Sequence, residues 1–260
     1  MRLSDHSHNI RFMYRQKVAR AKTKLAAKST NKFTIHPYYF SWQKRAFDVS
    51  VSGLALVIGL PLLVAIAVAV LFSSGPPIFF GQKRVGKGKK PFVMWKFRTM
   101  KVGADKEQRK YWRCNEAPAP MFKMHNDPRY TKIGKFLSAT GMDELPQLWN
   151  ILRGEMSVVG PRPLPVRESE MLEKMNEIKS TKKNGNLTKK KVAGDHQNHD
   201  WEFRYEVLPG VISEWAVNSK RFQSLDKWKQ LEKKTISCGD WKYDWELVKR
   251  TARYLTGKKI

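Results

Sequence analysis

An uncharged segment of the chain constrains its fold more than any other feature. No charged residue occurs between Asp48 and Lys83, and Val51–Phe72 within this stretch is almost wholly apolar. A helix of this length can cross the hydrocarbon core of a bilayer. The long polar stretch that precedes it distinguishes it from an ordinary signal peptide. The segment therefore predicts a membrane helix, and a buried helix of a soluble core is the weakest alternative.

Two features of this segment bear on how it would sit in a membrane. Pro61 lies near its middle, where a proline removes a helix hydrogen bond and bends the chain. Lys44 and Arg45 precede the segment, and a basic stretch at residues 83–90 follows it. Because basic flanks favour the cytoplasm, a hairpin that enters and leaves by one face satisfies both flanks. A kinked span satisfies them only in part, and physical reasoning alone leaves both topologies open.

The charge of the chain indicates a polyanionic partner. Among 260 residues, 50 are Lys or Arg and 23 are Asp or Glu, which gives a formal net charge of +27. Anionic lipid, phosphate-rich ligands and nucleic acid are all compatible with such an excess. No nucleic-acid motif is recognisable, so we expect a bilayer with anionic lipids and no nucleic acid. The basic residues 1–43 would favour such a surface, or form a solvated tail.

Cysteine and histidine give no sign of a metal or redox site. Cys114 and Cys238 lie far apart and are interpreted as reduced thiols. The histidines form no pair with the spacing of metal ligands, so we interpret them as solvated.

The patterns after the membrane segment predict a mixed α+β fold. Short strands are expected at residues 78–80, 92–97 and 157–159, and helices at 133–139, 146–153, 164–178, 225–234 and 243–255. Residues 179–200 are polar and rich in lysine. They predict a mobile insert because they contain few side chains that a core could bury.

Two adjacent carboxylates, Asp143 and Glu144, precede the helix expected from Pro146 onward. A helix N-terminus offers free N–H groups and a partial positive charge, which favour an ionised carboxylate and attract phosphate. An ionised Asp beside a phosphate can act as a nucleophile or a metal ligand. From these residues alone, capping of the helix by Asp143 is the commoner interpretation.

Three basic motifs could bind phosphate. In Gly160-Pro161-Arg162-Pro163, two prolines fix the backbone around a guanidinium suited to a bidentate grip, although a surface turn with an ion pair is an equal alternative. Strand alternation places Lys96 and Arg98 on one face, as an anion patch or, more commonly, a solvated strand edge. The cations of Gln82–Gly86 are interpreted as interfacial side chains that reach lipid phosphate.

Taken in order along the chain, these motifs resemble those of the bacterial sugar transferases, the monotopic polyprenyl-phosphate phosphoglycosyl transferases. The resemblance covers residues 42–165 strongly and 201–250 weakly. Each motif alone is weak, but the ordered set is specific. The matching pieces are Lys44–Asp48, Gly75–Pro76, Phe80, Gln82–Gly86, Lys96–Met100, Asp127–Thr131 with Gly134, Asp143–Asn150, Arg153–Ser157 and Gly160–Pro163.

The resemblance implies a reaction and a set of site residues. Asp143 would attack the β-phosphate of a nucleoside diphosphate sugar, typically a UDP-sugar, and form an aspartyl-phosphosugar intermediate. Undecaprenyl phosphate, a polyprenyl phosphate, would then take the sugar 1-phosphate and so initiate an exopolysaccharide, O-antigen, capsule or glycoprotein glycan. Glu144 would be the second catalytic carboxylate, and Mg²⁺ would bind at Asp143. The residues expected to bind substrate phosphate are Lys96, Arg98, Arg129 and Arg162.

The resemblance also implies an architecture. A re-entrant membrane helix broken at Pro61 would join a compact, mainly helical catalytic domain with short strands, on the cytoplasmic face of the bacterial inner membrane. The sequence leaves a homodimer open. The expected parts are a basic segment at 1–43, the membrane helix at 44–74, a catalytic core at 75–178, a Lys-rich insert at 179–200 and the remaining catalytic part at 201–260.

Some positions depart from the family pattern. Leu60 precedes the proline where the family often has Ser, and Ser138 stands where Arg is common. Pro209–Val217 differs from the usual motif, and Glu232 replaces the usual Asp while Asp244 keeps its spacing from it. Glu232 and Asp244 mark a candidate C-terminal site. These departures motivate one alternative, a scaffold or binding protein with the same fold and altered catalysis.

Overall fold

The computed structural model describes residues 33–183, 201–218 and 222–255. The chain divides into two units, residues 1–34 and 35–260, and every element below belongs to the second unit. Helices predominate and the strands form two small sheets, which confirms the mixed α+β class. The expected basic segment up to residue 32 and the expected insert from residue 184 lie outside the described residues.

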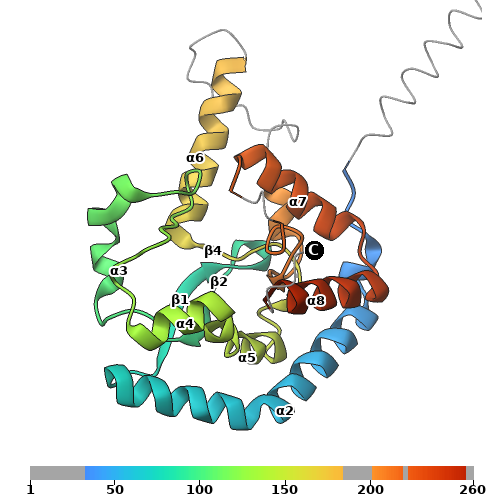
Figure 1. Ribbon diagram of the computed structural model, residues 1–260. Helices are drawn as coiled ribbons and strands as arrows, with labels where there is room; N and C mark the ends of the chain where they lie inside the picture. The colour runs from blue at the N-terminus through green and yellow to red at the C-terminus, as the bar shows by residue number, and fades with distance from the viewer. Residues whose placement is uncertain (1–32, 184–200, 219–221, 256–260) are drawn as a thin grey trace, which may run out of the picture. The chain divides into compact units, whose positions relative to one another are not determined.

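The apolar segment forms one long helix, α2 (Trp42–Ser74), with Pro61 inside it. Ser41 caps its start by accepting a hydrogen bond from the Lys44 N–H, and Gly75 ends it with a φ of 71°. Figure 1 shows α2 as two limbs that meet at an angle, as expected for a helix that contains a proline. By length and composition α2 is able to cross a membrane.

The two ends of α2 are covered by the rest of the unit, whereas its middle is not. Lys44, Asp48 and Ser52 are buried near the start, and Ile66 and Val70 near the end. A row of large apolar side chains between these ends is exposed, which is unusual for a water-soluble surface. The exposed residues are Leu54, Val57, Ile58, Leu60, Leu62 and Val64.

A three-stranded sheet follows α2. β1 (Phe79–Val85) pairs antiparallel with β2 (Pro91–Phe97) and, on its other edge, with β4 (Leu164–Pro165). The helix expected from residue 164 therefore begins later, as α6 (Val166–Lys183). Leu164 and Pro165 form a strand instead, because they pair with Val85 and Arg84 of β1. The local sequence pattern cannot reveal such a partner, since only the folded chain brings it near.

A second sheet joins distant parts of the chain, since β3 (Ser157–Val159) pairs parallel with β5 (Gly210–Ile212). Most of the expected helices are confirmed: α4 (Lys132–Thr140), α5 (Gln147–Leu152), α7 (Leu225–Ser237) and α8 (Trp241–Leu255). The shorter elements are α3 (Ala104–Glu107) and the 3₁₀ turns η1 (Pro37–Phe40), η2 (Lys87–Lys89), η3 (Gln108–Cys114), η4 (Met142–Glu144) and η5 (Glu202–Tyr205).

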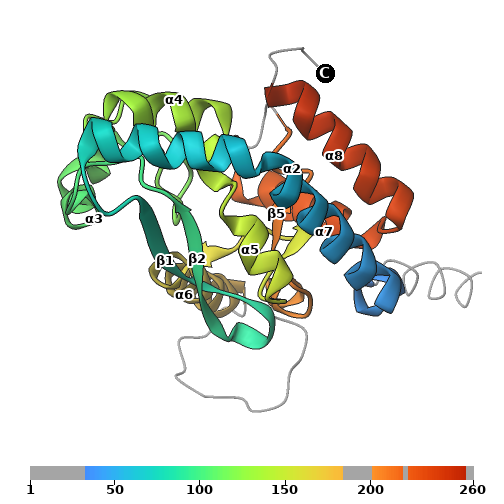
Figure 2. The same cartoon turned by 90° about the horizontal axis from the view of Figure 1, so that it is seen from below.

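Two apolar clusters hold these elements together. One joins β2, α5, β3 and α8 through buried residues that include Met94, Ile151 and Leu247. The other joins the second half of α2 to α4 through Val70 and Leu137, and Figure 2 shows these two helices side by side. The start of α5 is thereby fixed between the sheet and the long helix.

Asn150 fixes α5 to β2 more directly. Its side chain is fully buried, and its Oδ1 accepts a hydrogen bond from the Trp95 N–H at 3.1 Å. Its Nδ2 donates to the carbonyl of Val93 and to the carboxylate of Glu155, each at 2.7 Å. Because the Asp143–Glu144 turn directly precedes α5, this anchor also positions the turn.

Candidate active site

Asp143 lies in a tight turn between two helices. α4 ends at Gly141, whose φ of 72° is readily adopted by glycine. The chain then forms η4, which carries Asp143 and Glu144, and α5 begins after Pro146 without a side-chain cap. The interpretation of Asp143 as the cap of this helix is therefore wrong, since the 3₁₀ turn separates it from the first turn of α5.

The Asp143 carboxyl group is buried, with 7% of the residue exposed. Burial and, to a smaller extent, the neighbouring Glu144 raise its pKa to about 7. Lys96 and Arg162 act in the opposite direction because their positive charges favour the carboxylate. Two residues distant in the sequence, Lys96 and Arg162, thus influence the protonation of one carboxyl group.

Lys96 approaches this turn from β2. Its ammonium lies 5.7 Å from the centre of the Phe80 ring. Burial lowers its pKa, the Asp143 carboxylate opposes that effect, and the nearby Arg84 adds to it. The structure therefore brings Asp143, Glu144, Lys96 and Arg162 close enough for their charges to interact.

The turn that carries Arg162 is held by a buried ion pair. The Arg162 N–H donates to Glu232 Oε1 at 3.1 Å, and Arg204 Nη2 donates to the Arg162 carbonyl at 2.6 Å. Arg204 also pairs with Glu232 at 3.1 Å, and both side chains are almost fully buried. The Arg162 guanidinium lies 5.0 Å from the centre of the Trp215 ring. These contacts therefore orient both the backbone and the side chain of Arg162.

Arg84 was interpreted as an interfacial cation, and that interpretation is wrong. Its side chain is buried, with Nη1 donating to the Pro163 carbonyl at 2.8 Å and Nη2 to Gln82 Oε1 at 2.6 Å. Burial, together with the charge of Arg162, lowers its pKa to about 9. Strand alternation could have revealed it, because residue 84 is the buried position of β1 while Lys83 faces outward.

Two further charged residues near this cluster carry no signal in the sequence. Burial raises the pKa of Glu168 at the start of α6, and Arg84 and Arg162 oppose that rise. Arg204 lies in η5, some forty residues from Arg162 along the chain. Only the folded chain brings them close to the site.

Arg98 and Arg129 are engaged elsewhere. Arg98 Nη2 donates to the carbonyls of Ser74 at 2.7 Å and Gly75 at 2.5 Å, at the end of α2. Arg129 forms a two-pronged pair with Asp127. The structure thus does not bring these two predicted phosphate ligands into the group around Asp143.

Glu232 and Asp244 belong to two separate networks. Glu232 supports the Arg162 turn, whereas Asp244 accepts hydrogen bonds from Lys44 Nζ at 2.8 Å and from the Tyr38 hydroxyl at 3.3 Å. Lys44 also pairs with Asp48 at 2.8 Å. Burial raises the pKa of Asp244 to about 6 against the effect of Lys44. Asp244 therefore fixes the start of α2, and the two residues do not form one site.

The carboxylate pair suits a magnesium ion better than a transition metal. In the part of the chain that the structure describes, no three His, Cys, Asp or Glu side chains converge as a metal site. Mg²⁺ commonly binds through one or two carboxylates and completes its shell with water and substrate phosphate. Asp143 and Glu144 offer that set, and a cation would relieve the repulsion that raises the Asp143 pKa.

The chain is similar to known proteins over most of its length. The family model described as "Bacterial sugar transferase" matches residues 39–258. Exopolysaccharide production protein ExoY of Rhizobium meliloti is 43% identical over 132 residues, which cover 49% of this chain and 58% of that protein. The UDP-glucose:undecaprenyl-phosphate glucose-1-phosphate transferase of Escherichia coli is 34% identical over 191 residues, covering 74% of this chain and 34% of that protein.

A third relative, the undecaprenyl-phosphate galactose phosphotransferase of Salmonella typhimurium, is 42% identical over 132 residues, which cover 49% of this chain and 27% of that protein. The chain thus spans less than two thirds of the length of these relatives. The family model nevertheless covers most of the chain, including every residue around Asp143. The chain therefore belongs to the bacterial sugar transferase family.

Proposed function

We propose that this protein transfers a sugar 1-phosphate from a nucleoside diphosphate sugar, most simply a UDP-sugar, to undecaprenyl phosphate. The transfer would initiate synthesis of a polysaccharide or another glycan. The observation that carries the proposal is the buried Asp143 carboxyl group with two cations, Lys96 and Arg162, acting on its charge. The names of two relatives specify the same class of acceptor.

In the first half-reaction, an Asp143 carboxylate oxygen attacks the β-phosphorus of the donor. The bond from that phosphorus to the bridging oxygen breaks, and the nucleoside monophosphate leaves with the electron pair. Lys96 and Arg162 stabilise the negative charge on the phosphoryl oxygens, since fixed cations in a water-poor site act strongly. The fixed turn around Arg162 supports this role, because an ordered guanidinium needs little reorganisation.

In the second half-reaction, a phosphate oxygen of the polyprenyl phosphate attacks the same phosphorus. The bond to Asp143 breaks, which releases the polyprenyl diphosphate sugar and restores the carboxylate. One phosphate site serves both steps in turn, as a covalent intermediate allows. Arg84, whose buried guanidinium holds the Pro163 carbonyl, keeps the turn in place through both steps.

Asp143, with Glu144 beside it, would hold a Mg²⁺ ion. When bound, such an ion supplies neutralising charge for the donor diphosphate. The raised pKa of Asp143 supports this assignment, because a further positive charge besides Lys96 and Arg162 would favour the ionised form needed for attack.

We infer that α2 is re-entrant, entering and leaving the bilayer by one face. At its start, Arg45 donates to the carbonyls of Ile151 at 2.6 Å and Leu152 at 2.8 Å. At its end, the Ser74 carbonyl accepts from Arg98. Both ends are therefore bonded to one domain, whereas a straight span would place them on opposite faces of an apolar layer about 30 Å thick. The bend associated with Pro61 and the exposed middle of α2 support this topology.

With this topology, we propose that the domain lies on the cytoplasmic face of the bacterial inner membrane, because basic flanks are favoured there. Residues 44–74 would then be the membrane part, and residues 75–178 with 201–260 the catalytic part.

The proposal is tested by release of nucleoside monophosphate from a panel of donor sugars, with membranes that contain the full chain and polyprenyl phosphate. We expect turnover with one class of donor and loss of at least a thousandfold in Asp143→Asn, since the nucleophile is removed. Asp226→Asn, an exposed carboxylate in the first turn of α7, is the matched control and should keep full activity.

A phosphosugar adduct on Asp143, found by mass spectrometry after donor is added without acceptor, would exclude the scaffold alternative. Undiminished turnover in Asp143→Asn would instead disprove the assigned nucleophile. An adduct with no transfer upon addition of polyprenyl phosphate would show that the acceptor has been assigned wrongly.

A further inference from the structure

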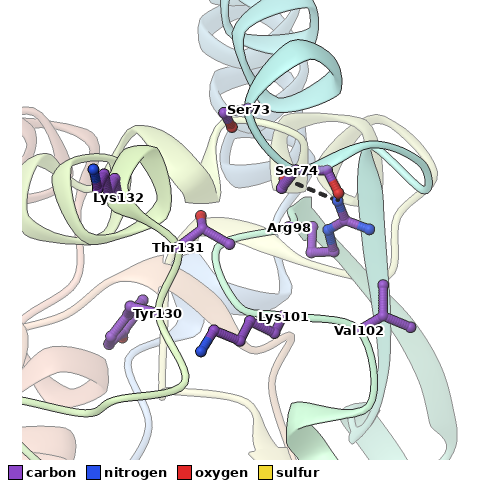
Figure 3. Close-up of a pocket in the computed structure, with 8 residues that line it drawn as sticks. All are labelled: Ser73, Ser74, Arg98, Lys101, Val102, Tyr130, Thr131 and Lys132. Carbon is purple, nitrogen blue, oxygen red and sulfur yellow. Dashed lines mark hydrogen bonds between the residues drawn. The ribbon is translucent and has the colours of Figure 1, made fainter.

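A polar hollow lies where the end of α2 meets the start of α4 (Figure 3). Its lining contains three cations and no carboxylate. Asp143, Glu144, Lys96 and Arg162 are not part of its lining, although Tyr130 on its wall is close enough to Asp143 for that carboxylate to contribute to its raised pKa, after the larger effect of burial. The lining residues are Ser73, Ser74, Arg98, Lys101, Val102, Tyr130, Thr131 and Lys132.

Arg98 gives the hollow a buried and partly unsatisfied charge. Only 4% of the residue is exposed. Its Nη2 donates to the carbonyl of Ser74 at 2.7 Å, to Ser74 Oγ at 2.9 Å and to the Gly75 carbonyl. Figure 3 shows Arg98 bonded to Ser74. Its Nε and Nη1 are buried and have no hydrogen-bond partner. Because buried donors are normally satisfied, these two nitrogens indicate a site that an anion would complete.

Two lysines add to this charge. Lys101 and Lys132 are both exposed and line the hollow. Among the residues that the structure describes, neither ammonium forms an ion pair with a carboxylate. α4 also begins here, and the N-terminus of a helix favours negative charge. The cations and the helix end therefore give the wall of the hollow a positive charge.

The backbone around the hollow is fixed in advance. The Thr131 N–H donates to the Thr99 carbonyl at 3.0 Å, and the Lys101 N–H donates to the Arg129 carbonyl at 3.0 Å. Gly134 lies directly against the Thr99 carbonyl, where any side chain would collide. The two segments that carry the lysines are thus held together without a ligand, so that binding needs little ordering of the chain.

The neighbourhood of the hollow is apolar. Phe72 near the end of α2 is 85% exposed, and Val102 in the lining is 74% exposed. If α2 is re-entrant, as proposed above, these side chains would meet lipid tails while the cations lie at headgroup depth. We propose that the hollow binds a phosphate group at the membrane surface, supplied by an anionic phospholipid headgroup or by free phosphate.

The inference is tested by chemical footprinting of lysines on the full-length protein in phosphate-free maltoside micelles. Acetylation of each lysine is measured by mass spectrometry in micelles alone, after addition of phosphatidylglycerol, and after addition of inorganic phosphate. Lys90 and Lys227, which lie outside the hollow, serve as internal controls. We expect protection of Lys101 and Lys132 on the order of fivefold, the effect of one lysine near an anionic surface.

The arms of the experiment separate the two sources. Protection by phosphatidylglycerol alone assigns a lipid headgroup, and equal protection by inorganic phosphate assigns a free phosphate. Unchanged acetylation in both arms, or equal protection of Lys90 and Lys227, overturns the proposal. Flotation of the protein with neutral vesicles, measured in parallel, tests insertion of α2 separately. A protein that does not insert into the membrane is thereby distinguished from one that inserts but binds no phosphate in the hollow.

A pair of double variants provides a second measurement. Lys101→Gln/Lys132→Gln should retain several-fold less phosphatidylglycerol per protein after purification than the wild type, measured as lipid phosphorus. Lys90→Gln/Lys227→Gln removes the same charge from other surfaces and should retain as much as the wild type. Equal retention by both double variants contradicts a specific site.

Discussion

The buried carboxylate of Glu232 accepts a hydrogen bond from the backbone N–H of Arg162 at 3.1 Å, across 70 positions of the chain. The same oxygen pairs with Arg204, which in turn donates to the Arg162 carbonyl. A residue in α7 thus positions the arginine that we assign to substrate phosphate. Glu232 acts through Arg162 and is not itself assigned a contact with the substrate.

Glu232→Ala should therefore lower both stability and turnover. Removing one partner of a buried ion pair leaves Arg204 uncompensated, which costs about 3–5 kcal/mol. We expect a large drop in melting temperature and, in the protein that remains folded, a fall in kcat on the order of tenfold or more because Arg162 is displaced. Glu232→Gln keeps an oxygen for the Arg162 N–H and should lose less of both.

Glu170→Ala provides the control for this pair of variants, because Glu170 is an exposed glutamate of α6. It should match the wild type in melting temperature and in kcat. Wild-type behaviour of Glu232→Ala would show that the Arg162 turn is held by other contacts.

The pH dependence of turnover should report the Asp143 carboxyl group. Its pKa is raised to about 7 by burial and by Glu144, and the nucleophile must be ionised. We expect kcat/KM to rise as pH increases and to level above about 7, since kcat/KM reports the free enzyme. Glu144→Gln should move the midpoint to lower pH because it removes the second cause of the raised pKa. A midpoint that is unchanged in Glu144→Gln would contradict this coupling.

The same group should make stability depend on pH. The pKa of Asp143 is higher in the folded protein than its usual value of 3.8, so the folded state binds more protons between these two values. Stability associated with this group is thus fully present below pH 4 and is lost as pH rises through about 7. Asp143→Asn, which cannot ionise, should melt at a higher temperature than the wild type at pH 8. The difference should shrink towards pH 4, and a constant difference would contradict the raised pKa.

Gly134 offers a test of the close packing between α4 and the segment after β2. A Cβ atom at this position would overlap the Thr99 backbone carbonyl. Gly134→Ala should therefore destabilise the protein by about 1–3 kcal/mol, the usual cost of an overpacked site. Gly59→Ala in α2, where a Cβ meets nothing within 4 Å, is the matched control. Thermal melting of both variants in detergent measures the difference, and equal melting temperatures would contradict this packing.

Much of the secondary structure could be predicted from local pattern. The residues of α4, α5, α7 and α8 carry amphipathic spacing or end signals within a few positions, and these helices agree with expectation. The start of α6 was misplaced because Leu164 and Pro165 pair with β1, whose free edge lies far away in the sequence. Local pattern cannot supply a partner that only the fold brings near.

Strand alternation predicted Lys96 and Arg98 on one face of β2, but in the structure only Lys96 lies in the strand. β2 ends at Phe97, so Arg98 leaves the pleat and turns toward the last carbonyls of α2. Lys96 stays within the strand and acts on Asp143. Alternation holds only while the strand continues, and its end was not visible in the residue types.

The sequence by itself determined the apolar segment of α2 and the order of the family motifs, because both depend on residues that are adjacent in the chain. The tertiary structure decided which charges meet. Arg84, Glu168 and Arg204 join Asp143, Lys96 and Arg162 through contacts between distant segments, while Arg98, Arg129 and Asp244 are drawn to other partners. Charge interactions depend on separation and burial, and both are set only when the chain has folded.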